Sequence, residues 1–141
     1  MSYKTKLNNI STFIFDVDGV LTDGKVYFLE NEIARALNSK DGYSLQYASK
    51  MGYSIFIITG GYSEDLKRRL LELGITEVHL KSSNKLKVYE KLAAKYNFRD
   101  EQVLYMGDDI PDIPVLRKAG LSCCPQDAAV DVKQVVDYHS P

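Results

Sequence analysis

Five short apolar segments, each followed by a polar or turn-forming loop, constrain the fold of this chain more than any other feature. They are residues 12–15, 53–58, 78–80, 103–106 and 121–124. Segments of this length with apolar side chains at successive positions are typical of strands that are buried on both faces of a sheet. Parallel sheets have this property, because the connections between parallel strands cover both faces. The sequence therefore predicts a central parallel sheet.

Segments with helical periodicity lie between these strands. They are residues 41–51, 63–73, 83–96 and 112–119. Ser63 is a typical N-cap, because its hydroxyl can accept free backbone N–H groups of the first helical turn, and Gly74 is a typical C-terminal stop. Asp112 can cap the last helix, with Pro114 in its first turn. The alternation of strands and helices predicts an α/β, three-layer Rossmann-like fold.

Residues 25–37 break this alternation. Residues 25–29 and 33–37 flank the polar run Glu30-Asn31-Glu32, which predicts a β-hairpin inserted after the first strand. The length of 141 residues fits one domain, residues 1–141.

Composition argues against several classes of partner. The net charge is −1, so the chain has no broad basic surface for nucleic acid. The longest apolar run, residues 54–58, is far too short to span a bilayer, and the first residues lead into no apolar region of a secretory signal. Cys123 and Cys124 are adjacent, and we expect free thiols at a buried strand end. These features predict a cytoplasmic protein with no nucleic-acid or membrane partner.

The polar residues that follow the strands carry the chemistry. Asp16 and Asp18 follow the first segment, Thr59 follows the second and Asp108 follows the fourth. Ligands of an open parallel sheet bind at the carboxyl ends of its strands, so we expect these side chains to converge. Carboxylate oxygens without a nearby His or Cys are typical ligands of Mg²⁺. A single Asp-x-Asp could instead be a loop that caps the next turn, but the second acidic loop at residues 107–109 argues against this alternative.

Thr59 and the glycines after it predict a phosphate site. The hydroxyl of Thr59 can contact a phosphate, and Gly60-Gly61 allows backbone N–H groups to approach closely. Lys85, at the start of a predicted helix, can pair with an anion held over the first acids. Because Lys81 and Lys87 flank it, a solvated helix face is the alternative for Lys85.

In chain order, these residues resemble the motifs of the haloacid dehalogenase superfamily. The matching segments are residues 16–24, 57–60, Lys85 and residues 107–112. Leu21-Thr22-Asp23-Gly24, the hairpin and Asp41-Gly42 further resemble the capless branch that acts on 3-deoxy-D-manno-octulosonate 8-phosphate (KDO 8-phosphate). The gap from Asp18 to Thr59 holds the hairpin and one helix, and neither it nor the next gap has room for a cap domain.

The resemblance implies a role for each acid. Asp16 attacks phosphorus and forms an aspartyl phosphate, while Asp18 protonates the leaving oxygen and then activates water. Mg²⁺ is held by Asp16, the backbone carbonyl of Asp18 and Asp108. Asp109 and Asp112 are expected to orient the motif lysine or to complete the outer shell of the metal.

The resemblance also implies a substrate site. Thr59, Gly60 and Lys85 hold the phosphoryl oxygens, and Asp41 joins the substrate-binding residues. The sequence departs from the branch at Gly61, where many relatives have a basic residue at this position or the next.

Recognition of a substrate carboxylate would then fall to Lys40, Arg68 or Arg69. Relatives also continue past the last strand with a glycine-rich tail, which would follow the last residue printed here.

In this branch, hairpins assemble a homotetramer in which neighbouring subunits cover each site. Tyr27, Phe28 and Leu29 fit such an interface, since apolar side chains gathered on an exposed hairpin mark a contact surface. The alternative is a hairpin that folds back onto its own domain.

Together these features predict a Mg²⁺-dependent phosphatase of a small sugar phosphate, with KDO 8-phosphate as the first candidate substrate. A nine-carbon keto-deoxy sugar acid 9-phosphate is the closest rival. Two other classes stay open: a non-catalytic oligomerisation module and a signalling receiver domain. The receiver is disfavoured because its acid pair precedes a lone acceptor aspartate, whereas here Asp-x-Asp comes first.

Overall fold

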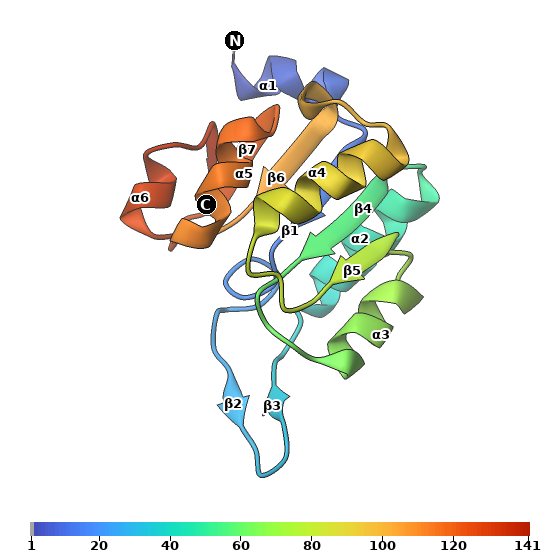
Figure 1. Cartoon of the computed structure of the whole chain (residues 1–141), viewed down its shortest axis with the longest axis vertical. Helices are drawn as coiled ribbons and strands as arrows, with labels where there is room; N and C mark the ends of the chain where they lie inside the picture. The colour runs from blue at the N-terminus through green and yellow to red at the C-terminus, as the bar shows by residue number, and fades with distance from the viewer. Residues whose placement is uncertain (1) are drawn as a thin grey trace.

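The central sheet has six parallel strands. The computed structural model describes residues 2–141, and the strand order is β5-β4-β1-β6-β7-β8 (Figure 1). The strands are β1 (Thr12–Phe15), β4 (Ser54–Ile58), β5 (Glu77–His79), β6 (Val103–Met106), β7 (Leu121–Pro125) and β8 (Tyr138–Ser140). The five predicted strands are confirmed. The edge strand β8 was not predicted, because Tyr-His-Ser carries no apolar run.

Helices cover both faces of this sheet and make the three predicted layers. They are α1 (Tyr3–Lys6), α2 (Ser39–Lys50), α3 (Glu64–Glu72), α4 (Lys85–Tyr96), α5 (Ile113–Lys118) and α6 (Val130–Lys133), with 3₁₀ turns at Leu7–Asn9, Asp100–Gln102 and Ile110–Asp112. The hydroxyl of Ser63 accepts the N–H of Leu66 and begins α3, and Gly74 follows that helix with a φ of +101°. None of the helices within residues 2–141 is long and apolar enough to cross a membrane.

The core divides along the alternation of strand side chains. Within β4, Ile55 and Ile57 pack with α2 and α3, whereas Phe56 and Ile58 pack with α4, α5 and α6. All four side chains are fully buried. Because both faces of β4 are covered, its carboxyl end is held firmly in place.

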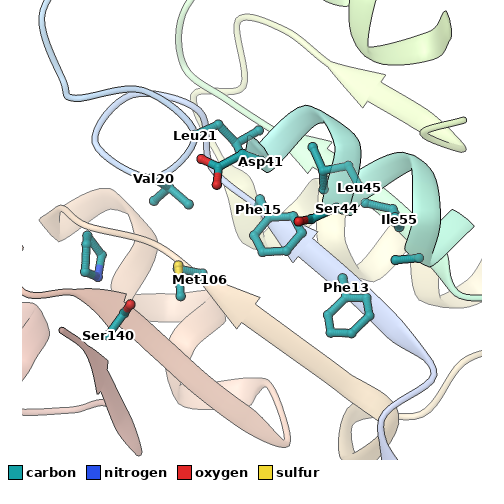
Figure 2. A pocket seen from close by; sticks show the side chains of 12 residues that line it. Phe13, Phe15, Val20, Leu21, Asp41, Ser44, Leu45, Ile55, Met106 and Ser140 are labelled. Atoms are coloured by element: carbon teal, nitrogen blue, oxygen red, sulfur yellow. The ribbon is translucent and has the colours of Figure 1, made fainter. Parts of the chain in front are cut away.

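One part of the sheet face is less well covered. A cavity of about 480 Å³ opens beside α2, over Phe13 and Phe15 of β1 and Met106 of β6 (Figure 2). Its lining is mostly apolar, and the carboxylate of Asp41 lies at its edge. This cavity therefore carries few groups for chemistry.

The predicted hairpin is confirmed and projects away from the sheet (Figure 1). Its strands are β2 (Tyr27–Phe28) and β3 (Ile33–Ala34), which pair antiparallel. Phe28 is 81% exposed, and Tyr27, Leu29 and Ile33 are exposed as well. The alternative in which the hairpin tip folds back onto its own domain is therefore wrong.

Candidate active site

The carboxyl ends of β1, β4 and β6 lie side by side, because β1 pairs with both other strands. The loops that leave them surround a cavity of about 430 Å³. Its lining residues are Asp16, Asp18, Gly24, Thr59, Gly60, Gly61, Ser82, Ser83, Lys85, Asp108, Asp109, Pro111 and Asp112. Parallel topology thus brings together the residues that the motifs singled out.

Asp16 directly follows β1 and is almost completely buried, at 6% exposure. Its backbone N–H donates to the carbonyl of Met106, and its Oδ1 accepts the N–H of Val17 at 2.7 Å. The Nζ of Lys85 lies 3.2 Å from the same oxygen. Burial and the charge of Asp112, only partly offset by Lys85, raise the pKa of Asp16 to about 6.

Lys85 is the first residue of α4, and its side chain extends to Asp16 in the loop after β1. Its side chain is 6% exposed, and its Nζ donates to Oδ1 of Asp112 at 2.8 Å. Burial opposes the charge of Lys85, but Asp112 and Asp16 outweigh it and raise the pKa above the ordinary lysine value. The alternative of a solvated helix face is wrong for Lys85.

Asp112 is fully buried, and its carboxylate contacts both the site and the backbone at the start of the 3₁₀ turn Ile110–Asp112. Its Oδ1 also accepts the hydroxyl of Tyr105 at 2.6 Å, and its Oδ2 accepts the backbone N–H groups of Asp108 at 3.1 Å and Asp109 at 3.3 Å. The prediction that its side chain caps the following helix is wrong, because the carboxylate turns inward to these donors. Asp109 also lines the cavity, but its carboxylate accepts the N–H of Ile110 at 2.8 Å and makes no hydrogen bond to Lys85.

Three carboxylates at this edge are close enough to share a cation. One oxygen each of Asp16, Asp108 and Asp112 lies within 4.8 Å of the others. Burial, followed by the charge of Asp16, raises the pKa of Asp108 to about 7. This excess of negative charge and the all-oxygen donor set fit a hard divalent cation. Gly19, with a φ of +82°, lies so close to Asp108 that any side chain there would overlap the carboxylate.

The loop after β4 presents Thr59, which is 2% exposed. Its carbonyl accepts the N–H of Ser82 at 2.9 Å, and its hydroxyl accepts the N–H of Gly61 at 3.2 Å. The carbonyl of Gly61 accepts the N–H of Lys81 at 3.0 Å. These bonds join the loops after β4 and β5, so the phosphate-site glycines are held in a defined conformation.

A family model provides the first comparison with known proteins. The haloacid dehalogenase-like hydrolases match residues 43–120, which is more than half of the chain. The chain belongs to this family.

Several relatives of this hydrolase share one activity in their names. The 3-deoxy-D-manno-octulosonate 8-phosphate phosphatase KdsC of Salmonella typhi is 41% identical over 88% of this chain and 66% of its own length. A Yersinia pestis phosphatase of the same name superposes with a TM-score of 0.93 and 36% identity, over 96% of this chain and 74% of that one. The Moraxella catarrhalis phosphatase, solved with magnesium, phosphate and KDO, superposes with a TM-score of 0.93 and 31% identity. The match covers 98% of this chain and 80% of that one. The chain spans about two thirds of the length of the curated relatives.

Sequence reasoning missed one residue of this hydrolase site. Arg35 follows β3 of the hairpin, and its guanidinium binds Asp18, with Nε 2.7 Å from Oδ1 and Nη2 3.2 Å from Oδ2. The hairpin had been considered only as a contact surface. No spacing rule links positions 18 and 35, because the pairing depends on how the hairpin lies against the catalytic loop.

The structure leaves four candidate residues outside the catalytic cavity. Asp41 stands in the first turn of α2 and lines the apolar cavity of Figure 2 rather than the catalytic cavity, and its part in substrate binding stays a prediction. Lys40 does not line the catalytic cavity. Arg68 pairs with Asp65 at 3.1 Å and Arg69 with Glu72 at 3.4 Å, all four on the exposed side of α3.

Proposed function

We propose that this hydrolase is a Mg²⁺-dependent phosphatase that works through an aspartyl phosphate and takes KDO 8-phosphate as substrate. The observation that carries the proposal is the buried Asp16, held by Lys85 at the end of the central strand, with Asp18 beside it. A carboxylate that is kept in place and partly freed from water is suited to attack phosphorus. The names of the relatives support the choice of substrate.

The contacts of Asp16 suggest which oxygen attacks. Its Oδ1 already accepts the N–H of Val17 and lies beside the Nζ of Lys85, so Oδ2 is the free oxygen. Attack by Oδ2 forms the new bond to phosphorus while the bond from phosphorus to the sugar oxygen breaks. Asp18 gives its proton to that oxygen. Asp18 then takes a proton from a water molecule, which attacks phosphorus and releases phosphate and Asp16.

Other groups of the cavity hold the transferring phosphoryl group. The hydroxyl of Thr59, the backbone of Gly60 and the ammonium of Lys85 line the cavity, the first two from the loop after β4 and the third from the start of α4. Asp112 keeps Lys85 in place at 2.8 Å. Positive charge aimed at the phosphoryl oxygens stabilises the charge that they carry in the transition state.

Mg²⁺ would be held by Asp16, the backbone carbonyl of Asp18 and Asp108. When bound, it neutralises negative charge on the phosphoryl group and on the carboxylates. Asp112 lies within the same cluster, but its four hydrogen bonds assign it to the support of Lys85 and of the loop backbone.

The proposal extends to assembly and location. Tyr27, Phe28 and Leu29 are 52%, 81% and 53% exposed at the tip of the hairpin, which supports a homotetramer joined through it. The buried thiols of Cys123 and Cys124 are free, which suits a reducing cytoplasm.

Release of inorganic phosphate tests the activity. The purified chain with Mg²⁺ is offered KDO 8-phosphate and a nine-carbon keto-deoxy sugar acid 9-phosphate, with and without a chelator. We expect turnover of the eight-carbon substrate. If the nine-carbon compound is turned over faster, it is the substrate instead.

Asp16→Asn should lower the rate by at least about 1,000-fold, as expected for loss of a nucleophile. Asp131→Asn, on the exposed face of α6, is the control. Full activity of Asp16→Asn would refute the mechanism.

A further inference from the structure

Arg35 connects the hairpin to one carboxylate of the catalytic cavity. Its Nε and Nη2 contact separate oxygens of Asp18, at 2.7 and 3.2 Å, so the ion pair is bidentate. A planar guanidinium bound in this way fixes the plane of a carboxylate as well as its position. The side chain of Asp18 is 34% exposed, and no other side chain of the described residues is hydrogen-bonded to its carboxylate.

The surroundings of Arg35 are unusual for a residue that only stabilises a loop. Its side chain is 8% exposed, and its Nη1 is the one buried side-chain nitrogen or oxygen of residues 2–141 without a hydrogen-bond partner. Buried donors are nearly always satisfied, because an unsatisfied one is unfavourable. Two of the three guanidinium nitrogens of Arg35, Nε and Nη2, therefore donate hydrogen bonds to Asp18, while the third, Nη1, has no partner.

Gly61 leaves the space that Arg35 occupies. A Cβ at position 61 would lie 2.6 Å from Nη2 of Arg35 and 3.4 Å from Oδ2 of Asp18. A side chain at this position would therefore displace the guanidinium. The absence of a side chain at Gly61 and the presence of Arg35 are thus two parts of one arrangement.

We propose that Arg35 is the positioning residue for proton transfer by Asp18, an inference that rests on the proposed phosphatase function. The shorter bond from Nε anchors Oδ1. Asp18 takes a proton from solvent on Oδ2, where the proton replaces the longer contact from Nη2. That proton passes to the sugar oxygen as its bond to phosphorus breaks, and Arg35 keeps all of its own protons. Arg35 lines a neighbouring cavity with Ser63 and Leu66 rather than the catalytic one, so it acts through Asp18 and not on the substrate.

Leaving groups of different basicity test this role. Arg35→Met is compared with the unchanged chain in single-turnover reactions on KDO 8-phosphate and on p-nitrophenyl phosphate. The sugar oxygen needs a proton to leave, whereas p-nitrophenolate leaves without one. We expect the first-turnover rate to fall roughly 10- to 100-fold on the sugar phosphate, which is no more than the lower end of the usual contribution of general acid catalysis, because Asp18 itself is still present. The rate on the aryl phosphate should change less than about threefold, and KM should change little.

Two further variants separate positioning from folding. Arg35→Lys keeps a positive charge without the bidentate fork and should recover only part of the lost rate. Arg99→Met removes an exposed arginine that pairs with Glu101 at 3.2 Å, and it should leave both substrates unaffected. Equal losses on both substrates, a rise in KM alone, or full activity of Arg35→Met would each overturn the proposal. An unchanged chain that hydrolyses neither substrate would instead refute the phosphatase function.

Gly61→Ala provides an independent test. If its methyl group acts by displacing Arg35, it should lower the sugar-phosphate rate in the unchanged chain but have almost no effect in an Arg35→Met background. Equal effects of Gly61→Ala in both backgrounds would contradict the inference, because the methyl group would then act through the phosphate loop itself.

Discussion

Asp16 and Asp18 are two residues apart in one loop, yet they are held by different regions of the molecule. Asp16 is 6% exposed and contacts Lys85, which belongs to a helix packed on the sheet. Asp18 is 34% exposed at its side chain and contacts Arg35, which belongs to a hairpin of two two-residue strands. An isolated hairpin of this size has little stability of its own. The proposed nucleophile is thus held by a helix packed on the sheet, and the proposed acid by a small hairpin that projects from the domain.

Loss of Lys85 should have the largest effect on stability. Lys85→Met leaves the fully buried Asp112 and the neighbouring Asp16 without their cation, and breaking a buried ion pair from one side costs about 3–5 kcal/mol. Lys87→Met, two residues further along the same helix and exposed, is the matched control. The free energy of unfolding in urea measures both. Similar small losses in the free energy of unfolding for the two variants would show that the buried ion-pair cluster around Lys85 does little to stabilise the fold.

The pH dependence of stability should reveal the crowded carboxylates. The pKa values of Asp16 and Asp108, raised to about 6 and about 7, lie above the value of about 3.9 for an unfolded chain. Between pH 4 and 7 the folded state therefore binds more protons than the unfolded state, and stability falls as the pH rises.

Asp108→Asn should remove part of this penalty. In the presence of a chelator, we expect the variant to be more stable than the unchanged chain by roughly 1–3 kcal/mol at pH 8, and to differ little at pH 4. Thermal unfolding at both pH values measures the difference. An equal gain at pH 4 and pH 8 would exclude ionisation of Asp108 as its cause.

Tyr105→Phe tests how far the support of Asp112 matters for catalysis. Its hydroxyl donates to Asp112 at 2.6 Å, and the hydroxyl of Tyr89 donates to Asp100 at the same distance, away from the cavity. Both phenylalanine variants should lose about 1 kcal/mol of stability. Only Tyr105→Phe should also lower kcat, by a few-fold, since only it loosens the anchor of Lys85. Equal kcat values for the two variants would contradict this.

A change at the hairpin tip should have the smallest effect on the fold. Phe28 is 81% exposed, so Phe28→Ser should change the free energy of unfolding by no more than about 0.5 kcal/mol. Its effect should be on assembly, with sedimentation showing a lower mass than that of the unchanged chain. An unchanged mass would remove Phe28 from the proposed interface.

The fold was largely predictable because its strands are short, apolar and buried on both faces. Thr12–Phe15 and Val103–Met106 were predicted with the observed boundaries. The sixth strand, Tyr138–Ser140, was missed because an edge strand needs no apolar run. The short helices Tyr3–Lys6 and Val130–Lys133 were also missed, since four residues are too few to show periodicity.

By itself, the sequence determined that Asp16, Thr59 and Asp108 would meet, because residues that follow neighbouring parallel strands must lie at one edge of the sheet. Only the tertiary structure decided what each acid contacts. For Asp112 the sequence allowed a helix cap, the orientation of Lys85 or an outer-shell metal contact, and the structure shows the bond to Lys85. Asp18 is bound by Arg35 of the hairpin. The positions of the strands follow from patterns that are local in the chain. The partners of a side chain depend on where separate loops come to rest against each other, and no local pattern encodes that.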